Sequence, residues 1–339
     1  MIISKTPLRI SFFSGGSDME SFYKKEPGAA LSCTIDKYIY TLVHQSRHMN
    51  FKTMYDDIQT YESLDDIQHD ITREALKYYG MSSMTDTVTT GSISDIIAKG
   101  SGLGSSSAFT VGILNCLKQS QENTFGKFSK LYDNKRVLAE EACKIEIEKC
   151  GFPIGKQDQY AAAYGGFNLY RFNTDGSVDI TSPSIPEKAL RKLENNLFLV
   201  YSGKPRSANA ILKKQNDAMT DSHKFQLVAN SRDKAYEGMK LLCENKVEDF
   251  AHLLHRAWMD KKQVTKDISN TFFDDIYDKA IQNGAIGGKL LGAGGGGFFI
   301  FYVPPDSRRD VAIAITNGTG CKIYDFNFTF NGSTIIGND

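Results

Sequence analysis

The residues best suited to chemistry lie in a glycine- and serine-rich stretch, residues 100–108 (GSGLGSSSA). Its glycines let the backbone approach a ligand closely, three serines follow, and a helical pattern begins at Ala108. The first N–H groups of a helix lack partners and carry partial positive charge, so phosphate binds well there. A serine-rich helix cap beside flexible glycines is the competing interpretation. The density of glycine and serine before a regular helix favours phosphate.

Two common nucleotide-binding motifs are excluded. No Gly-Lys pair in the chain is followed by Ser or Thr, which rules out a Walker P-loop. A GxGxxG occurs at residues 292–297, but a strand-like run (FFIFYV, 298–303) follows it, whereas a dinucleotide fingerprint must open a helix. The glycines of residues 284–297 therefore predict a loop that lies against a ligand or another backbone.

A third glycine pair, Gly15 and Gly16, precedes Ser17 and Asp18 directly after an expected strand at residues 2–13. An aspartate in such a turn is either solvated or available to sugar hydroxyls, and the residues alone leave both open.

Composition excludes several classes of protein. The chain has 339 residues, 41% of them hydrophobic and 24% charged, which is typical of a globular protein of two domains. Forty basic residues balance forty acidic ones, so no overall field attracts nucleic acid or an anionic membrane. No signal peptide or membrane span is predicted. The six scattered cysteines are expected to be free thiols, and together these features predict a cytoplasmic protein.

Two histidines, His252 and His255, lie three residues apart on an expected helix. Because no third ligand follows at a suitable spacing, a packed or solvated helix face is favoured over a metal site.

The elements that must position these residues mix strand and helix patterns without regular βαβ alternation, which predicts an α+β fold. Strands are expected at residues 2–13, 35–44, 167–172, 197–201, 298–303 and 322–330, and helices at 108–119, 136–150, 157–164, 249–264 and 308–317. Residues 175–186 are rich in Ser, Pro and Asp and predict a domain junction. We therefore expect one domain over residues 1–180 and a second over 181–339.

Three segments in this order resemble the GHMP kinase superfamily, named for galactokinase, homoserine kinase, mevalonate kinase and phosphomevalonate kinase. They are residues 6–18 (TPLRISFFSGGSD), 102–108 (GLGSSSA) and 289–297 (KLLGAGGGG), and they span nearly the whole chain. The resemblance implies the two-domain GHMP kinase fold. Its N-terminal, ATP-binding domain would be like ribosomal protein S5 domain 2, and its C-terminal domain ferredoxin-like.

Within the superfamily the chain is most similar to the D-glycero-D-manno-heptose 7-phosphate kinases. Residues 155–160 (GKQDQY), residues 163–166 (AYGG) and the spacing of His255, Trp258 and Lys261 carry this resemblance. It implies phosphorylation of the anomeric C1 hydroxyl, with ATP and Mg²⁺, to a 1,7-bisphosphate used in nucleotide-activated heptose synthesis for surface glycans. The alternatives are a kinase of a neutral sugar such as fucose or galactose, or a catalytically silent sugar or nucleotide sensor.

The expected partners are therefore a sugar phosphate and ATP, without nucleic acid or membrane, and a homodimer is left open. The second motif departs from the family, because Ala98-Lys99-Gly100 stands where prolines are usual. The glycines and serines expected to contact phosphate remain.

The resemblance also implies roles for single residues. Asp158 is expected to be the general base, with Arg9 or Lys156 offsetting charge near the γ-phosphate. Ser106 and Glu146 are expected to bind Mg²⁺; Glu148 is disfavoured because it points to another helix face. The ATP phosphates are expected to contact Gly100, Ser101, Gly102, Leu103, Gly104, Ser105, Ser106 and Ser107.

The acceptor sugar is expected to contact two of the glycine loops. The expected residues are Gly15, Gly16, Ser17, Asp18, Gly294 and Gly295. Its own phosphate needs a cationic pocket, for which Lys204 and Arg206 are the candidates, since Arg suits bidentate phosphate contacts. An exposed basic loop is an equally open interpretation of these two residues.

Overall fold

The computed structural model describes residues 1–339 except 47–49, 56, 82–86, 98, 126–133, 205–207 and 339. In this described part the larger sheet has the order β12-β1-β2-β5-β3-β4, and β6 joins it through β2, with β7 beyond. The strands are β1 (Ile2–Phe13), β2 (Gly28–Ser46), β3 (Phe51–Met54), β4 (Ile58–Tyr61), β5 (Thr87–Ser94), β6 (Phe167–Phe172), β7 (Val178–Thr181) and β12 (Thr334–Asn338).

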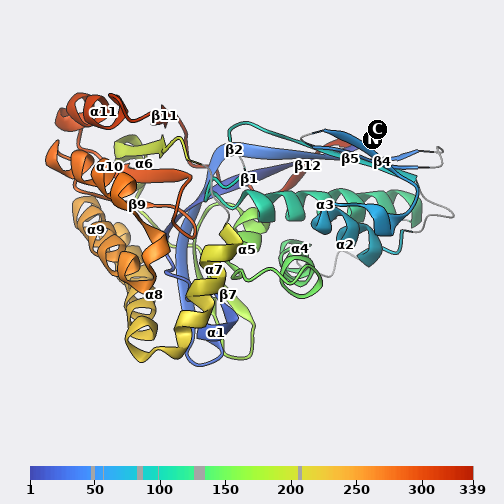
Figure 1. Ribbon diagram of the computed structural model, residues 1–339, viewed down its shortest axis with the longest axis horizontal. Helices are drawn as coiled ribbons and strands as arrows, with labels where there is room; N and C mark the ends of the chain where they lie inside the picture. Colours follow the sequence, from blue (N-terminus) through green and yellow to red (C-terminus); the bar gives the residue numbers. More distant parts are fainter. Residues whose placement is uncertain are drawn as a thin grey trace.

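The long antiparallel pair of β1 and β2 forms the spine of this sheet (Figure 1). Its register runs from Ile2 opposite Val43 to Phe13 opposite Leu31, and it shifts between Pro7 and Leu8. A proline has no N–H to donate, so an irregularity at this position is expected. The part of β1 beyond the shift carries residues of the first motif.

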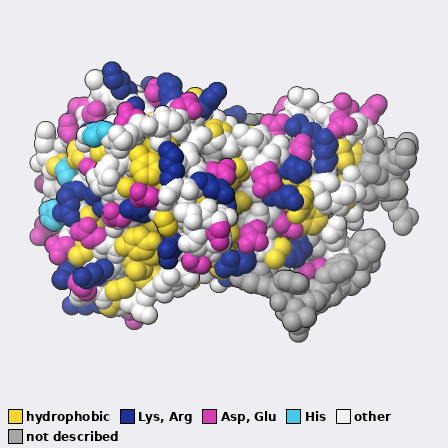
Figure 2. Space-filling view, turned by 90° about the horizontal axis from the view of Figure 1, so that it is seen from below, with side chains coloured by type: hydrophobic (Ala, Val, Ile, Leu, Met, Phe, Trp, Pro, Cys, Tyr) yellow, Lys and Arg dark blue, Asp and Glu magenta, His cyan; other side chains and the backbone are white. Residues whose placement is uncertain are grey.

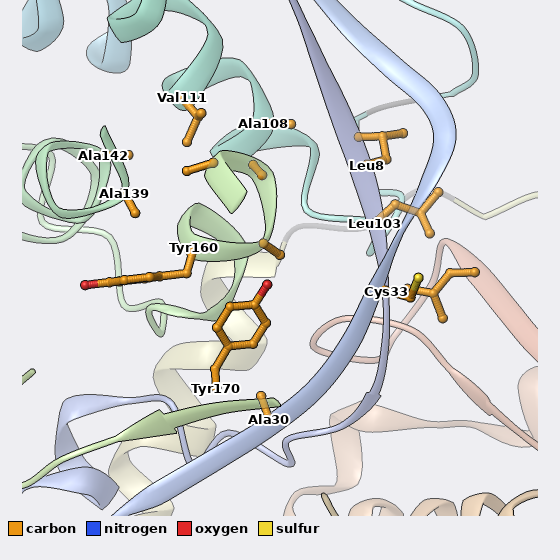
Figure 3. Close-up of a cluster of buried hydrophobic side chains, with 14 of the residues drawn as sticks. Leu8, Ala30, Cys33, Leu103, Ala108, Val111, Ala139, Ala142, Tyr160 and Tyr170 are labelled. Atoms are coloured by element: carbon orange, nitrogen blue, oxygen red, sulfur yellow. The ribbon is translucent and has the colours of Figure 1, made fainter. Parts of the chain in front are cut away.

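Helices cover one face of the larger sheet, as Figure 1 shows for α2 (Asp70–Tyr78), α3 (Ser105–Phe125) and α4 (Asn134–Cys143) below the strands. The π-helix η2 (Lys144–Lys149) continues α4, and α5 (Gln157–Tyr164) follows it. The core between these layers is apolar. Figure 3 shows Val111 of α3, Ala139 of α4 and Tyr160 of α5 gathered there with Tyr170 of β6.

The second sheet has the order β11-β8-β10-β9 and lies at the other end of the molecule (Figure 1). Its strands are β8 (Leu197–Tyr201), β9 (Gly287–Leu290), β10 (Phe298–Tyr302) and β11 (Lys322–Tyr324). The remaining helices are α1 (Glu20–Tyr23), α6 (Glu187–Asn196), α7 (Ala208–Asp217), α8 (Ser222–Cys243), α9 (Val247–Val264), α10 (Thr271–Gln282) and α11 (Arg308–Thr316). The ring of Phe250 on α9 packs edge-on against Phe12 and Phe13 of β1, which joins the two parts.

The α+β prediction is confirmed, and so are most of the expected elements. The strand expected at residues 322–330 is wrong in its second half: β11 ends at Tyr324, and Phe328 makes only an isolated bridge to Ile35. Sequence reasoning also missed β12, which pairs with β1 and so returns the end of the chain to the first sheet. The division after residue 180 falls within β7, and we keep it as a proposal.

The surface agrees with the balanced composition. On the face drawn in Figure 2, basic and acidic side chains are interspersed, and neither sign dominates it. All six cysteines are free thiols, as expected, and four of them are buried. No helix in the part of the chain that the structure describes is long and apolar enough to cross a bilayer.

Candidate active site

A cleft of about 480 Å³ brings the three glycine loops together. The first motif lines it with Arg9, Ser11, Ser14, Gly15, Gly16 and Asp18, the second with Gly100, Gly102, Gly104, Ser105, Ser106 and Ser107, and the third with Lys289, Gly292 and Ala293. Segments almost 280 residues apart in the sequence therefore share one cavity. Gln157 and Asp158 from α5 complete the same wall.

The second motif forms the start of α3. The helix begins at Ser105, three residues earlier than expected, so the three serines lie in its first turn. Gly104 has φ +75°, and a Cβ there would lie 3.3 Å from Arg9 Cγ and 3.4 Å from the Asp158 carboxylate. The loop therefore passes close to both charged side chains while the first turn of α3 lines the cleft, and a helix start suits a phosphate.

Two expected ATP ligands instead support this loop from inside. Leu103 is fully buried, and its carbonyl oxygen accepts a hydrogen bond from Arg9 N (3.0 Å). Ser101 is also buried, and its Oγ accepts from Leu103 N (3.2 Å). Neither residue is among those that line the cleft, so the structure does not bring these two expected ATP contacts to it.

Arg9 and Asp158 form a bidentate ion pair at the centre of the cleft. Arg9 Nε donates to Asp158 Oδ1 (2.7 Å) and Nη2 donates to Oδ2 (2.6 Å). The third guanidinium nitrogen donates to the Gly102 carbonyl oxygen (2.6 Å), so Arg9 ties the carboxylate to the loop. The Arg9 side chain is only 5% exposed and that of Asp158 is 28% exposed. This geometry holds the carboxylate in one orientation while leaving it open to a ligand.

Asp18 also contacts the start of α5. Ser14 Oγ donates to its Oδ1 (2.9 Å), and Gln157 N donates to its Oδ2 (3.3 Å). Burial raises the pKa of the Asp18 carboxyl, and repulsion from Asp158 raises that pKa further. A carboxyl group with a raised pKa, held by two donors, is suited to exchange hydrogen bonds with hydroxyls of a ligand.

Glu146 lies behind the serines of the second motif, in the wide turn of the π-helix η2. Ser106 Oγ donates to its Oε1 (2.7 Å), while Ser107 Oγ and Gln159 Nε2 donate to its Oε2 (2.7 Å each). The residue is completely buried, and burial raises its pKa even though these three donors lower it. Glu148, two residues further on, is exposed, as expected.

The oxygens of Ser106 and Glu146 fit a magnesium ion. Carboxylate and hydroxyl oxygens suit Mg²⁺, which takes one or two protein ligands and completes its shell with water and substrate phosphate. No basic side chain in the described residues lies within ion-pair distance of Glu146. A bound cation would therefore offset a buried negative charge. No cluster of three His, Cys, Asp or Glu occurs within the described ranges, so an all-protein metal cage is not present there.

The third motif mainly packs against protein. Gly297 has φ +87°, and a Cβ there would lie 2.2 Å from the Ser101 carbonyl oxygen. Phe298 N donates to that same oxygen (3.0 Å). The sequence predicted that this loop lies against a ligand or another backbone. The structure confirms contact with another backbone, that of Ser101 in the second motif.

Three of the residues expected to contact the acceptor do not line the cleft, namely Ser17, Gly294 and Gly295. Gly295 N donates to the Ile268 carbonyl oxygen (2.8 Å), and Gly294 lies against the same residue, so both pack against protein. Ser17 is buried, and its Oγ donates to the Ala29 carbonyl oxygen (2.8 Å). Gly15 and Gly16 do line the cleft.

Two expected cations lie away from the cleft. Lys156 Nζ donates to the Gly176 carbonyl oxygen (2.7 Å) and lies over the Tyr23 ring, so its position does not support a catalytic role. Lys204 Nζ lies over the ring of Phe272 and is not among the lining residues. Arg206 lies outside the described residues.

Three lysines that sequence reasoning did not assign to the site line the cleft instead. Lys99, Lys261 and Lys289 line the cleft with Arg9, against two lining carboxylates. Lys261 Nζ donates to the Gly292 carbonyl oxygen, and Lys289 Nζ donates to that of Phe12 (2.9 Å). Both lysines lie inside patterns that carried the family resemblance, so those patterns were the signal that could have found them.

His255 has a structural role, as expected. Its Nδ1 lies 2.8 Å from Tyr277 Oη, and burial lowers its pKa.

The arrangement is suited to phosphoryl transfer. The start of α3 with the Ser106 hydroxyl, an excess of two basic side chains and an oriented carboxylate share one cavity. Such transfer asks a protein mainly for positioning and charge stabilisation.

Comparison with known proteins agrees with this geometry. Residues 70–166 match the GHMP kinases N terminal domain, and residues 239–317 match the GHMP kinases C terminal. A D-glycero-alpha-D-manno-heptose 7-phosphate kinase of Campylobacter jejuni is 29% identical over 98% of this chain and 97% of its own length. A mevalonate kinase of Pyrococcus abyssi is 30% identical over 89% of this chain and 80% of its own.

Solved structures show the same fold. A D-glycero-D-manno-heptose 1-phosphate kinase from Bacteriodes thetaiotaomicron aligns over 100% of both chains with a TM-score of 0.79 and 23% identity. A galactokinase of Lactococcus lactis, crystallised with galactose, aligns over 98% of this chain and 94% of its own with a TM-score of 0.72 and 14% identity. The chain therefore belongs to the GHMP kinase family, has its two-domain fold and is a kinase.

Proposed function

We propose that this kinase transfers the γ-phosphoryl group of ATP to the anomeric C1 hydroxyl of D-glycero-D-manno-heptose 7-phosphate. The product, a 1,7-bisphosphate, would enter the synthesis of nucleotide-activated heptose for surface glycans. The observation that carries the proposal is the bidentate Arg9–Asp158 pair, which orients a partly open carboxylate beside the phosphate loop. The likeness to the Campylobacter heptose 7-phosphate kinase over nearly the full length supports this choice of sugar.

In this mechanism Asp158 accepts the proton of the C1 hydroxyl. The oxygen forms a bond to the γ-phosphorus, the bond from that phosphorus to the β-phosphate oxygen breaks, and ADP leaves. Arg9 stabilises the negative charge beside Asp158, and the N–H groups at the start of α3 bind the phosphates. Mg²⁺, held by Ser106 and Glu146, would offset charge on the ATP phosphates.

The acceptor would be bound by the part of the cleft that the first motif lines. Asp18 and the backbone of Gly15 and Gly16 would bind its hydroxyls. The lining has an excess of two basic groups, which favours an acceptor that carries its own phosphate over a neutral sugar. Lys261 replaces Lys204 as a candidate partner of that phosphate, and Arg206 stays a candidate.

A substrate panel tests the proposal. Purified protein with Mg-ATP is mixed separately with heptose 7-phosphate, free heptose, fucose and galactose, and ADP release is measured. We expect the highest kcat/KM for heptose 7-phosphate. Turnover of fucose or galactose without turnover of the heptose phosphate would instead support a neutral-sugar kinase. ATP binding without ADP release for any sugar would support a sensor.

A further inference from the structure

Lys289 is a buried lysine at the junction of the first and third motifs. It lies on β9, just before the third loop, and its side chain enters the cleft with only 5% of the residue exposed. Its Nζ donates to the Phe12 carbonyl oxygen on β1 (2.9 Å). The amine is thus held at a fixed point of the cleft by a residue only three positions from Arg9.

The surroundings of Lys289 are unfavourable for a charge in the free protein. Its Nζ donates to the neutral carbonyl group of Phe12, and no carboxylate in the described part of the chain lies within ion-pair distance of it. Burying an ammonium group without an anion is costly. Burial lowers the pKa of Lys289 to about 7, with a further lowering from the neighbouring Arg9 cation.

An anionic ligand would reverse this situation. Arg9 connects the two sites, because its guanidinium is hydrogen-bonded to Asp158 and it lines the same cleft as Lys289, whose pKa its charge lowers. A phosphoryl group that reaches Asp158 therefore comes close to both cations. Its negative charge would stabilise the ammonium form of Lys289, and the ammonium would in turn stabilise the phosphoryl group.

We propose that Lys289 is a further catalytic residue, whose ammonium group contacts the phosphoryl group during transfer to the acceptor. The lysine forms no covalent bond and keeps its proton, while the proton of the acceptor goes to Asp158. The third motif then supplies a catalytic cation as well as a packing surface for the phosphate loop. The inference rests on the proposed transfer at Asp158, and it does not depend on which sugar is the acceptor.

A merely structural role makes a different prediction. The bond from Lys289 to Phe12 also ties β9 to β1, and this tie by itself would position the third loop. Two variants separate the effect of losing the charge of Lys289 from the effect of losing its hydrogen bond to Phe12. Lys289→Met keeps the unbranched apolar stem but loses both the charge and the donor, whereas Lys289→Gln loses the charge and keeps an N–H donor. Lys279→Met, on the surface of α10, is the matched control for loss of a lysine.

The test measures kcat, the KM of each substrate and the equilibrium binding of ATP, with the acceptor that the wild-type protein uses best. We expect kcat to fall about 100- to 1,000-fold in both Lys289 variants, as for loss of one charge-stabilising donor. We expect each KM and the Kd for ATP to stay within about threefold, because the charge acts mainly in the transition state. Lys279→Met should retain the wild-type kcat.

Three results would overturn the inference. They are a Gln variant with nearly wild-type kcat, a loss carried by KM alone, and a Met variant that is fully active. If Lys289→Met does not fold, the Gln variant alone decides. Failure of heptose 7-phosphate as a substrate in the panel would refute the proposed sugar but leave this test intact with another acceptor.

Discussion

The loop at residues 100–104 and the loop at residues 292–297 are both rich in glycine, yet they use it differently. In the first, the glycines bring the backbone to the cleft wall, and the start of α3 follows. In the second, Gly297 allows close contact with the Ser101 carbonyl oxygen, and β10 follows. The first loop lines the cleft, and the glycine-rich end of the second loop packs behind it. The element that follows the glycines, helix or strand, separates the two.

The largest effect is expected from replacing Arg9, whose side chain joins the loop at residues 100–104 to Asp158. In Arg9→Met the carboxylate loses both guanidinium bonds and the Gly102 carbonyl loses its donor. We expect kcat to fall about 1,000-fold, the upper range for loss of an electrostatic donor. Arg9→Lys keeps a charge without the bidentate geometry and should be intermediate. Equal activity of the Met variant and wild type would contradict the assigned role.

The next largest effect is expected on stability, from a substitution in the loop at residues 292–297. A Cβ in Gly297→Ala would overlap the Ser101 carbonyl oxygen, and φ is +87°, so we expect a loss of about 3 kcal/mol in the free energy of unfolding. Gly80→Ala is the control: its φ is +71° but nothing lies within 4 Å, so it reports the backbone term of about 1 kcal/mol alone. Denaturant unfolding measures both. Equal losses would show that packing on the phosphate loop is unimportant.

A smaller effect is expected at the metal site behind the phosphate loop. Glu146→Gln removes the charge expected to offset Mg²⁺, and we expect kcat at fixed Mg²⁺ to fall about 10- to 100-fold. Added Mg²⁺ should recover part of the loss. Glu148→Gln, exposed in the same π-helix, is the matched control and should behave like wild type. A titration of ADP release against Mg²⁺ distinguishes the two, and identical curves would remove Glu146 from the site.

The smallest effect is expected in how the free energy of unfolding depends on pH, because Lys289 on β9 is buried. Folding lowers the pKa of Lys289 from 10.5 to about 7, so between these values the unfolded chain binds more protons. The free energy of unfolding of wild type should therefore rise with pH over this window, by about 1 kcal/mol per pH unit relative to Lys289→Met. Urea unfolding of both proteins at pH 7, 8 and 9 measures this difference. A constant difference would show that Lys289 stays charged.

Local patterns predicted the parts of the fold that depend on local sequence. The bounds of β1, β6 and α5 match the expected segments, because apolar runs and glycine stops define them. The pairing of β12 with β1 was missed, since a terminal strand of five residues carries little local signal. Its place depends on a sheet edge more than 300 residues away in the sequence.

Site residues that belong to a recognised motif could be predicted from the sequence. The direction of a side chain could not be predicted where tertiary contacts determine it. Asp158 and Ser106 both line the cleft, and Ser106 Oγ donates to Glu146, which is buried behind it. Lys156 lies two residues before Asp158, yet its Nζ donates to the Gly176 carbonyl oxygen. Lys289 is buried in the cleft, where its Nζ reaches the Phe12 carbonyl oxygen on β1, a contact that its neighbours in sequence do not indicate.

The central claim is that phosphoryl transfer takes place at Asp158 beside the phosphate loop. Asp158→Asn keeps the shape of the side chain but removes the charge and the base. The direct measurement is kcat from ADP release together with the Kd for ATP from calorimetry on the same preparation. We expect kcat to fall at least about 100-fold while the Kd for ATP changes less than about threefold. An Asn variant that turns over at the wild-type rate would contradict the claim.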